Sequence, residues 1–183
     1  MVFNYLGEMV EENFGLEAWD GLLQKTGLTG QFVASETYPD EDLFALVAAA
    51  NEATGIDVKE LLRSFGRFML PEFEKQNPQF FEGHTDLISF LLTVDRVIHV
   101  EVRKLHPDAA LPEFGYDENS EKELTMYYTS PRKLCFLAEG LIDASAARFN
   151  TKYELSHTQC MHDGADKCTL CLLYTSPSPR DRG

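Results

Sequence analysis

The chain lacks any run of eighteen or more apolar residues, and it does not start with basic residues followed by a short apolar stretch and small residues. The first absence argues against a membrane-spanning helix. The second argues against a secretory signal peptide. We therefore expect a cytoplasmic protein with no membrane partner. In such a chain the four cysteines are expected to be reduced thiols or metal ligands rather than disulfides.

Basic residues are scarce. The chain has 16 Lys and Arg against 30 Asp and Glu, which gives a formal net charge of −14 and an isoelectric point near 4.7. Nucleic-acid binding needs clustered basic residues to contact phosphates, and none are seen, so we expect no nucleic-acid partner. An acidic surface keeps a protein soluble and suits basic protein partners.

Motifs for enzymatic chemistry are also missing. The sequence shows no Ser/His/Asp order, no phosphate-binding loop and no pair of carboxylates that stands out as catalytic. Its many Asp and Glu residues follow the pattern of solvated helix faces. We expect a protein that is not an enzyme.

The pattern of apolar residues predicts one α+β domain, since 183 residues with 44% hydrophobic content suffice for a single sizeable core. Helical spacing and capping residues predict a helical N-terminal part with helices over about 2–14, 16–24, 40–54, 57–68 and 86–105. In the last and longest of these, Thr85 is the expected cap and Pro107 ends the helix. A smaller part follows, with an antiparallel sheet and a helix, from strands over about 113–118, 122–129, 151–160 and 166–170 and a helix over 131–149.

The last residues, 171–183, change abruptly to Ser, Pro and Arg and resemble the in-frame translation of a sequencing adapter. We interpret them as a non-native tail and leave them out of the expected fold. On this interpretation the natural protein continues differently after about Leu170, and Cys171 is not a native residue.

Three hydrogen-bond donors alternate in the segment from Tyr128 to Arg132. In an extended chain Tyr128, Ser130 and Arg132 point to the same side and can converge on a pair of carboxylates. Pro131 keeps Ser130 out of the helical region and suits a first helical residue, so the segment predicts a strand that runs into a helix start, where anions bind. The alternative is an N-cap serine beside an ordinary surface tyrosine and arginine.

His99 lies in an apolar stretch of the helix predicted over 86–105, where a neutral imidazole can ligate a metal. The alternative is a histidine that is satisfied in the core or at its boundary. A metal ligand on one element and a clamp for two carboxylates on another match haem, which presents iron at its centre and two propionates at its edge.

With these residues the chain resembles the haem nitric oxide/oxygen binding (H-NOX) family, the sensor fold also found in soluble guanylate cyclase, in its stand-alone bacterial form. The likeness covers residues 1–170 as a single domain, including the stretches 13–19 and 106–112. It implies a helical subdomain over about 1–60, a haem-binding part over about 61–170, and haem b between them. The resemblance also implies roles for single residues. Tyr128, Ser130 and Arg132 match the family's propionate-binding motif. His99 matches its proximal iron ligand, and Pro112 matches the proline that packs on the haem. His106 is a weaker candidate ligand, because Pro107 ends the helix there and favours a capping role.

The choice of gas is expected to depend on the residue five places after Arg132. Oxygen-binding members of the family carry a tyrosine there, whereas this chain has Leu137, which cannot donate a hydrogen bond to bound oxygen. The resemblance thus implies a nitric oxide sensor that excludes oxygen. Leu137 also fits an apolar stripe with Leu134, and both interpretations can hold because that stripe would line the pocket. Tyr5 is the other hydroxyl that could reach this pocket.

The resemblance also implies how a signal leaves the domain. Binding of nitric oxide lengthens or breaks the bond from iron to His99, and the helix that carries His99 relaxes as a two-state element. Nothing in the chain resembles an output domain, so we expect a separate partner. Stand-alone relatives commonly work in trans with a histidine kinase or a cyclic-di-GMP enzyme.

Three cysteines and a histidine form a second candidate site with the ligand types of structural zinc: Cys135, His157, Cys160 and Cys168. The alternative is that the cysteines are inert small hydrophobic residues. Some members of the resembled family carry a Cys3His zinc site, and these positions fit it. His162 and Cys171 are weaker substitutes. The cluster supports an alternative function, a zinc/thiol redox sensor in which an oxidant releases zinc, with or without haem.

Overall fold

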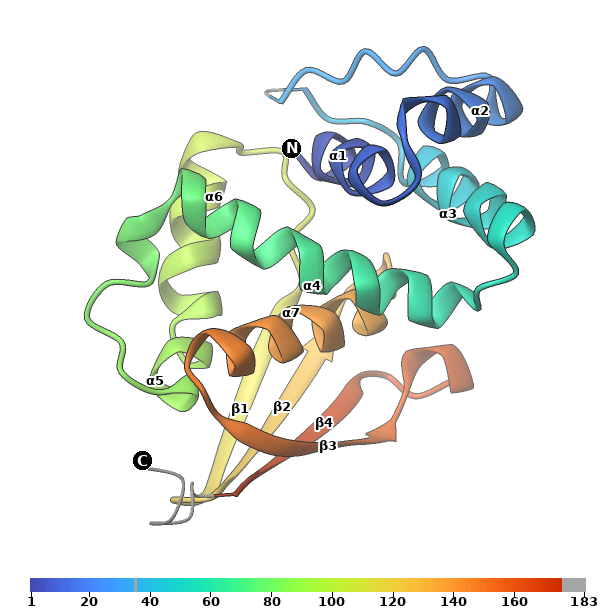
Figure 1. Cartoon of the computed structure of the whole chain (residues 1–183). Coiled ribbons are helices and arrows are strands. Elements are labelled where there is room, and N and C mark those ends of the chain that lie inside the picture. Colours follow the sequence, from blue (N-terminus) through green and yellow to red (C-terminus); the bar gives the residue numbers. More distant parts are fainter. Residues whose placement is uncertain (35, 176–183) are drawn as a thin grey trace, which may run out of the picture.

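The computed structural model describes residues 1–34 and 36–175. Helices form the first part of the chain and a mixed layer of helix and sheet forms the second (Figure 1). The α-helices are α1 (Val2–Phe14), α2 (Leu16–Thr26), α3 (Asp40–Thr54), α4 (Val58–Gln76), α5 (Leu87–Leu91), α6 (His99–Leu105) and α7 (Cys135–Arg148). Short helical turns are η1 (Pro78–Phe80), η2 (Val94–Ile98) and η3 (Met161–Asp163). The strands are β1 (Glu113–Ser120), β2 (Glu123–Thr129), β3 (Lys152–Gln159) and β4 (Cys168–Thr175).

Glycines and one aspartate set the boundaries of the N-terminal helices. Gly15 separates α1 from α2, and Gly55 ends α3 in the left-handed conformation that glycine adopts without steric cost. The Asp57 side chain caps α4 by accepting a hydrogen bond from the backbone N–H of Lys59. These boundaries confirm the predicted helices over 2–14 and 40–54.

The prediction that the fourth helix stops near Phe68 is wrong. Helix α4 continues through Pro71 to Gln76, although a proline inside a helix removes one backbone hydrogen bond. The packing of α4 along α7 compensates for the missing backbone hydrogen bond. The two helices are in backbone contact, because a Cβ at Gly66 would overlap the Leu137 carbonyl oxygen and one at Gly140 would overlap the Arg63 carbonyl oxygen.

The helix predicted over 86–105 is not continuous. It divides into α5, the π-helical turn η2 and α6, and η2 ends directly before His99. The Asp86 side chain caps α5 by accepting from the Ser89 N–H, so Thr85 is not the cap. The helix does end before Pro107, as predicted, with His106 at its C-cap. Single π-turns are frequent at functional sites.

The sheet is antiparallel with the strand order β1-β2-β4-β3. Tyr128 of β2 pairs with Cys168 of β4, and Met126 pairs with Leu170. Strand β4 does not stop at Leu170 as expected: it continues to Thr175 and buries Leu172 and Tyr174. Five residues assigned to the tail thus extend the alternation of the strand. Residues 176–183 lie outside the described part, and the non-native origin of the tail stays a prediction.

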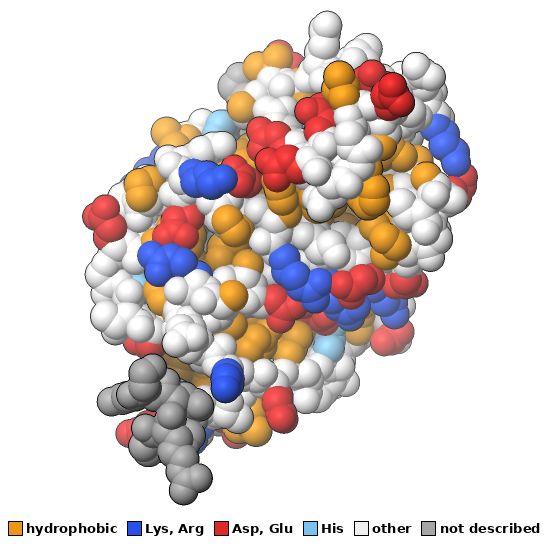
Figure 2. Space-filling view, in the orientation of Figure 1, with side chains coloured by type: hydrophobic (Ala, Val, Ile, Leu, Met, Phe, Trp, Pro, Cys, Tyr) orange, Lys and Arg blue, Asp and Glu red, His pale blue; other side chains and the backbone are white. Residues whose placement is uncertain are grey.

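Helices α4 and α7 lie along each other above the sheet, with α1–α3 on one side and α5 and α6 on the other (Figure 1). One core cluster joins α1–α4 to the start of α7, and a second joins α5 to the sheet. This arrangement confirms the α+β fold. Basic and acidic side chains gather over α4 on the face in Figure 2. Among the described residues, no helix combines the length and apolar character needed to cross a membrane.

Candidate functional site

Tyr128, Ser130 and Arg132, here called the carboxylate clamp, all line one cavity, as their alternation predicts. Tyr128 and Ser130 are 2% and 3% exposed. The expectation that Pro131 starts a helix is wrong, because α7 begins at Cys135 after a tight turn in which Lys133 has a φ of 50°. Hydrogen bonds from the Leu134 N–H to the Tyr128 hydroxyl (2.9 Å) and from the Arg132 N–H to Ser130 Oγ (3.2 Å) hold this turn.

Arg132 is also bound to the N-terminal helices. Its Nε lies 2.8 Å from Asp40 Oδ1, at the first residue of α3, and its Nη1 donates to the Ala110 carbonyl oxygen at 3.4 Å. Asp40 was not predicted as a site residue, because it is one of three acidic residues in the first turn of α3. These two contacts orient the guanidinium of a residue that also lines the cavity.

His99 is buried at the first residue of α6 and lines the same cavity. Burial lowers the pKa of its imidazole, while the Asp95 carboxylate raises it, and burial has the larger effect. The side chain is thus neutral near pH 7, as a metal ligand must be. Nδ1 lies 3.4 Å from Asp95 Oδ1, and a proton on Nδ1 leaves the Nε2 lone pair for a metal.

The cavity lies between α1, α4, α7 and the helices around His99. His106, the weaker candidate ligand, does not line it. Most of the side chains in its walls are apolar, and every predicted haem-site residue is among them. The lining residues are Met1, Val2, Tyr5, Met69, Leu70, Phe73, Phe90, Leu91, Val94, Ile98, His99, Val102, Ala110, Leu111, Pro112, Phe114, Met126, Tyr128, Ser130, Arg132, Leu134, Leu137, Ala138, Leu141, Ile142 and Ser145.

Tyr5 and Leu137 both line the cavity and belong to the core cluster formed by the N-terminal helices and the start of α7. The Tyr5 hydroxyl is buried and has no hydrogen-bond partner among the described residues. Burial raises the pKa of Tyr5 to about 12, so the phenol keeps its proton at neutral pH. A polar tip on the buried face of α1 was the sequence signal for this group, but only the fold places it in the cavity.

These residues fit haem by their chemistry. A neutral histidine lines an apolar cavity, and a tyrosine, a serine and an arginine in its wall are donors of the kind that two propionates need. Pro112 lies in the wall beside His99, as its expected packing on haem requires. The roles of these residues toward haem stay predictions.

The second predicted site is also assembled. Its four candidate ligand atoms lie within 4.8 Å of one another, and we call this group the Cys3His cluster: Cys135, His157, Cys160 and Cys168. The cysteines are free thiols. Sγ of Cys135 and Sγ of Cys160 are 3.8 Å apart. Two thiolates on a tetrahedral zinc, with Zn–S bonds of about 2.3 Å, would be separated by roughly 3.8 Å.

The elements bring the cluster together from distant parts of the chain. Cys135 comes from the first turn of α7, His157 from β3 and Cys168 from the start of β4. Burial raises the pKa of the Cys135 and Cys168 thiols, with a further contribution from the neighbouring sulfurs at Cys135. A divalent cation supplies the opposing charge that stabilises thiolates.

The two substitute ligands lie elsewhere. Nε2 of His162 is 2.8 Å from the Lys133 carbonyl oxygen, and its ring stacks on Phe136. Cys171 Sγ lies next to Thr125 Oγ1 at 3.9 Å, in the part of β4 beyond the cluster. Neither belongs to the group of four that the structure brings together.

His157 shows the chemistry of a metal ligand. Its Nδ1 is 2.6 Å from the Glu139 carboxylate, and its buried Nε2 has no hydrogen-bond partner among the described residues. An Nδ1–H that donates to Glu139 leaves the Nε2 lone pair free for a cation. Glu139 was not among the predicted residues, although an acidic residue between Ala138 and Gly140 in an apolar stretch is a signal in the sequence.

Comparison with known proteins agrees with the fold. The family model described as Haem-NO-binding matches residues 1–157. The H-NOX protein from S. oneidensis in the Fe(II)NO ligation state superimposes with a TM-score of 0.90 at 30% identity, covering 96% of this chain and 98% of that chain. The Fe(II) unliganded H-NOX protein from K. algicida gives 0.88 at 27% identity, covering 96% of both chains.

A third solved structure, the H-NOX from Shewanella woodyi in the Fe(II)CO ligation state with IWP-051 bound, gives a TM-score of 0.83 at 31% identity. It covers 100% of this chain and 96% of that chain. The match of the family model to most of the chain and the shared fold lead to one conclusion. This chain belongs to the haem-NO-binding (H-NOX) family of haem-based gas sensors.

Proposed function

We propose that this protein binds nitric oxide at ferrous haem b, excludes oxygen, and signals to a separate partner protein. The observation that carries the proposal is that His99 and the carboxylate clamp line the same apolar cavity. His99 Nε2 would hold the iron, and the clamp would hold the propionates. Haem supplies an iron with one open coordination position for a diatomic gas.

Leu137 supports the choice of nitric oxide. It lines the cavity, is 8% exposed, and offers bound oxygen no hydrogen-bond donor. Oxygen on iron carries partial negative charge and needs such a donor, whereas ferrous nitrosyl does not. The Tyr5 hydroxyl is the group that opposes this proposal, because it is buried in the same cavity without a partner.

The helix around His99 supports a conformational output. The π-helical turn η2 separates α5 from α6, so His99 lies at a junction rather than inside a regular helix. A junction of this kind gives the segment two arrangements that a ligand can favour differently. We propose a histidine kinase or a cyclic-di-GMP enzyme in the cytoplasm as the partner that responds in trans.

Absorption spectra of the ferrous protein test this proposal directly. We expect a red protein whose Soret band is unchanged under air, apart from slow oxidation, and shifts when nitric oxide is added. A stable oxygen complex would contradict oxygen exclusion. A protein that takes up no haem during reconstitution would contradict the haem site itself.

The Cys3His cluster supports a second candidate function, a zinc/thiol redox sensor. Its geometry suits zinc, and thiolate ligands are sites of oxidation that release the metal. Peroxide titration of the zinc-loaded protein with a colorimetric zinc indicator tests it. Zinc release that changes binding of the partner favours this function, whereas an unchanged response to peroxide argues against it.

A further inference from the structure

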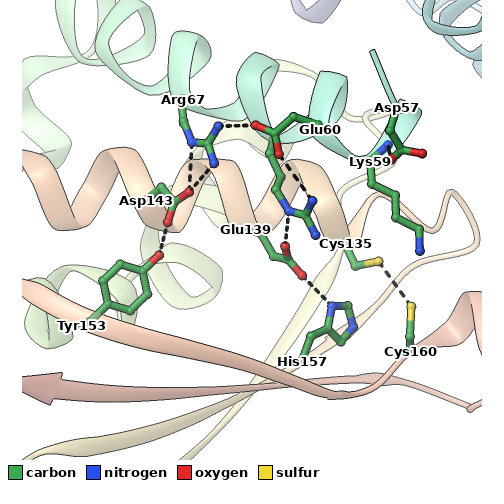
Figure 3. Close-up of polar contacts among 11 residues, drawn as sticks. Asp57, Lys59, Glu60, Arg67, Cys135, Glu139, Asp143, Tyr153, His157 and Cys160 are labelled. Carbon is green, nitrogen blue, oxygen red and sulfur yellow. Dashed lines mark hydrogen bonds and ion pairs between the residues drawn. The ribbon is translucent and has the colours of Figure 1, made fainter. Parts of the chain in front are cut away.

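One buried carboxylate links the Cys3His cluster to a different helix. Glu139 is 4% exposed on α7, and its two carboxylate oxygens have different partners. Oε1 is 2.6 Å from Nδ1 of His157, and Oε2 accepts a hydrogen bond from Nε of Arg63 on α4 at 2.6 Å. Figure 3 shows the Glu139 carboxylate pointing toward the ring of His157.

The contact with Glu139 determines which nitrogen of His157 is available. A carboxylate only accepts hydrogen bonds, so the proton of the neutral imidazole is placed on Nδ1. Nε2 then carries the lone pair, and it is buried with no partner among the described residues. Because a buried nitrogen without a partner is costly, the arrangement is explained best by a cation bound to Nε2 and the three sulfurs.

Arg63 is itself held in place. Its guanidinium lies 5.1 Å from the centre of the Phe136 ring, and Nη1 is 3.5 Å from a Glu60 oxygen. The Arg63 side chain is 29% exposed and that of Glu139 is 6% exposed. A carboxylate buried to this degree needs a charged or strongly donating partner, and Arg63 supplies it.

A matched pair of residues lies one helical turn further along the same two helices. Arg67 of α4 donates to Asp143 of α7 at 3.0 Å, and Asp143 accepts from the Tyr153 hydroxyl rather than from a histidine (Figure 3). This pair is more exposed, and neither residue belongs to the Cys3His cluster. It offers a control for the loss of an α4–α7 ion pair alone.

We propose that Glu139 positions His157 for metal binding and that the Arg63–Glu139 ion pair fastens the metal site to α4. The proposal rests on zinc binding at the Cys3His cluster. Around this ion pair the α4 and α7 backbones touch at Gly66 and Gly140. Both helices also line the cavity that contains His99. The Glu139 carboxylate therefore links the metal site to two helices that form walls of this cavity.

Zinc competition with a chromophoric chelator tests this role in the protein of residues 1–183. We expect Glu139→Ala to weaken zinc binding by about 10- to 100-fold, the usual cost of losing a partner behind a histidine ligand. Asp143→Ala should bind zinc as the wild type does. Circular dichroism before and after zinc removal checks that each variant is folded.

A conservative variant separates positioning from simple packing. The amide oxygen of Glu139→Gln can still accept from His157 Nδ1–H, so we expect its affinity for zinc to lie between those of the wild type and Glu139→Ala. Equal losses in the Gln and Ala variants would overturn the positioning role. Glu139→Gln also keeps the test valid if Glu139→Ala does not fold.

The attachment to α4 has its own test. We expect Arg63→Met to weaken zinc binding several-fold and Arg67→Met to leave it unchanged; equal affinities in both would overturn this part. Wild-type protein that binds no zinc would contradict the zinc site itself. Wild-type protein that binds zinc while Glu139→Ala binds it equally well would overturn only the inference about Glu139.

Discussion

Asp40 and Arg132 form an ion pair of 2.8 Å that joins the first residue of α3 to the last residue of the carboxylate clamp. These residues lie far apart in the sequence, in the helical N-terminal part and in the turn after β2. The pair therefore connects the N-terminal helices to the edge of the haem cavity where the propionates are expected.

Asp40→Asn should destabilise the haem-free protein only slightly. The Asp40 side chain is 38% exposed, so the pair is partly screened by water, and we expect a loss of about 0.2–1 kcal/mol in the free energy of unfolding. Urea denaturation at low and high salt measures it. A difference from the wild type that is just as large at high salt would contradict an electrostatic origin.

His99→Ala should produce a protein that loses its haem or retains it only when imidazole is added, because the substitution removes the proposed iron ligand. Haem content after gel filtration, with and without imidazole, measures this. His106→Ala is the control, since His106 caps α6 away from the cavity, and it should keep its haem. Normal five-coordinate ferrous spectra in His99→Ala would disprove the ligand assignment.

Leu137→Tyr should create an oxygen complex that the wild type lacks, because it places a hydroxyl donor in the wall of the cavity. Ferrous spectra under air, with stopped-flow measurement of oxygen dissociation, detect it.

Tyr5→Phe removes the unpartnered hydroxyl at nearly constant volume and should leave the response to nitric oxide intact. An oxygen complex in the wild type that disappears in Tyr5→Phe would show that Tyr5 is the donor.

Cys168→Ser should lose most of its zinc, because it removes a thiolate ligand from the Cys3His cluster. Cys171→Ser is a matched control on the same strand, outside the cluster, and should retain the metal. Elemental analysis after dialysis against a weak chelator compares the two variants. Zinc at wild-type occupancy in both Cys168→Ser and Cys135→Ser would rule out the ligand set.

Local patterns in the sequence were sufficient for most of the fold. Helical spacing, capping residues and glycines predicted α1 and α3 within a residue or two, and aromatic and β-branched content predicted β1 and β2. They failed where packing overrides a local preference. Pro71 is tolerated because α4 packs along α7. The predicted helix that carries His99 divides into three pieces, α5, η2 and α6.

For the candidate sites, the sequence alone determined the residue types and their spacing: the alternating carboxylate clamp, His99 in an apolar helix, and the cysteines and histidine of the second site. Only the tertiary structure decided which of them share a cavity and what supports them. Asp40 behind Arg132, and Arg63 with Glu139 behind His157, act across long separations in the chain. The side chain of a single acidic residue gives no local sign of its partner, because that contact exists only after distant helices and strands have packed together.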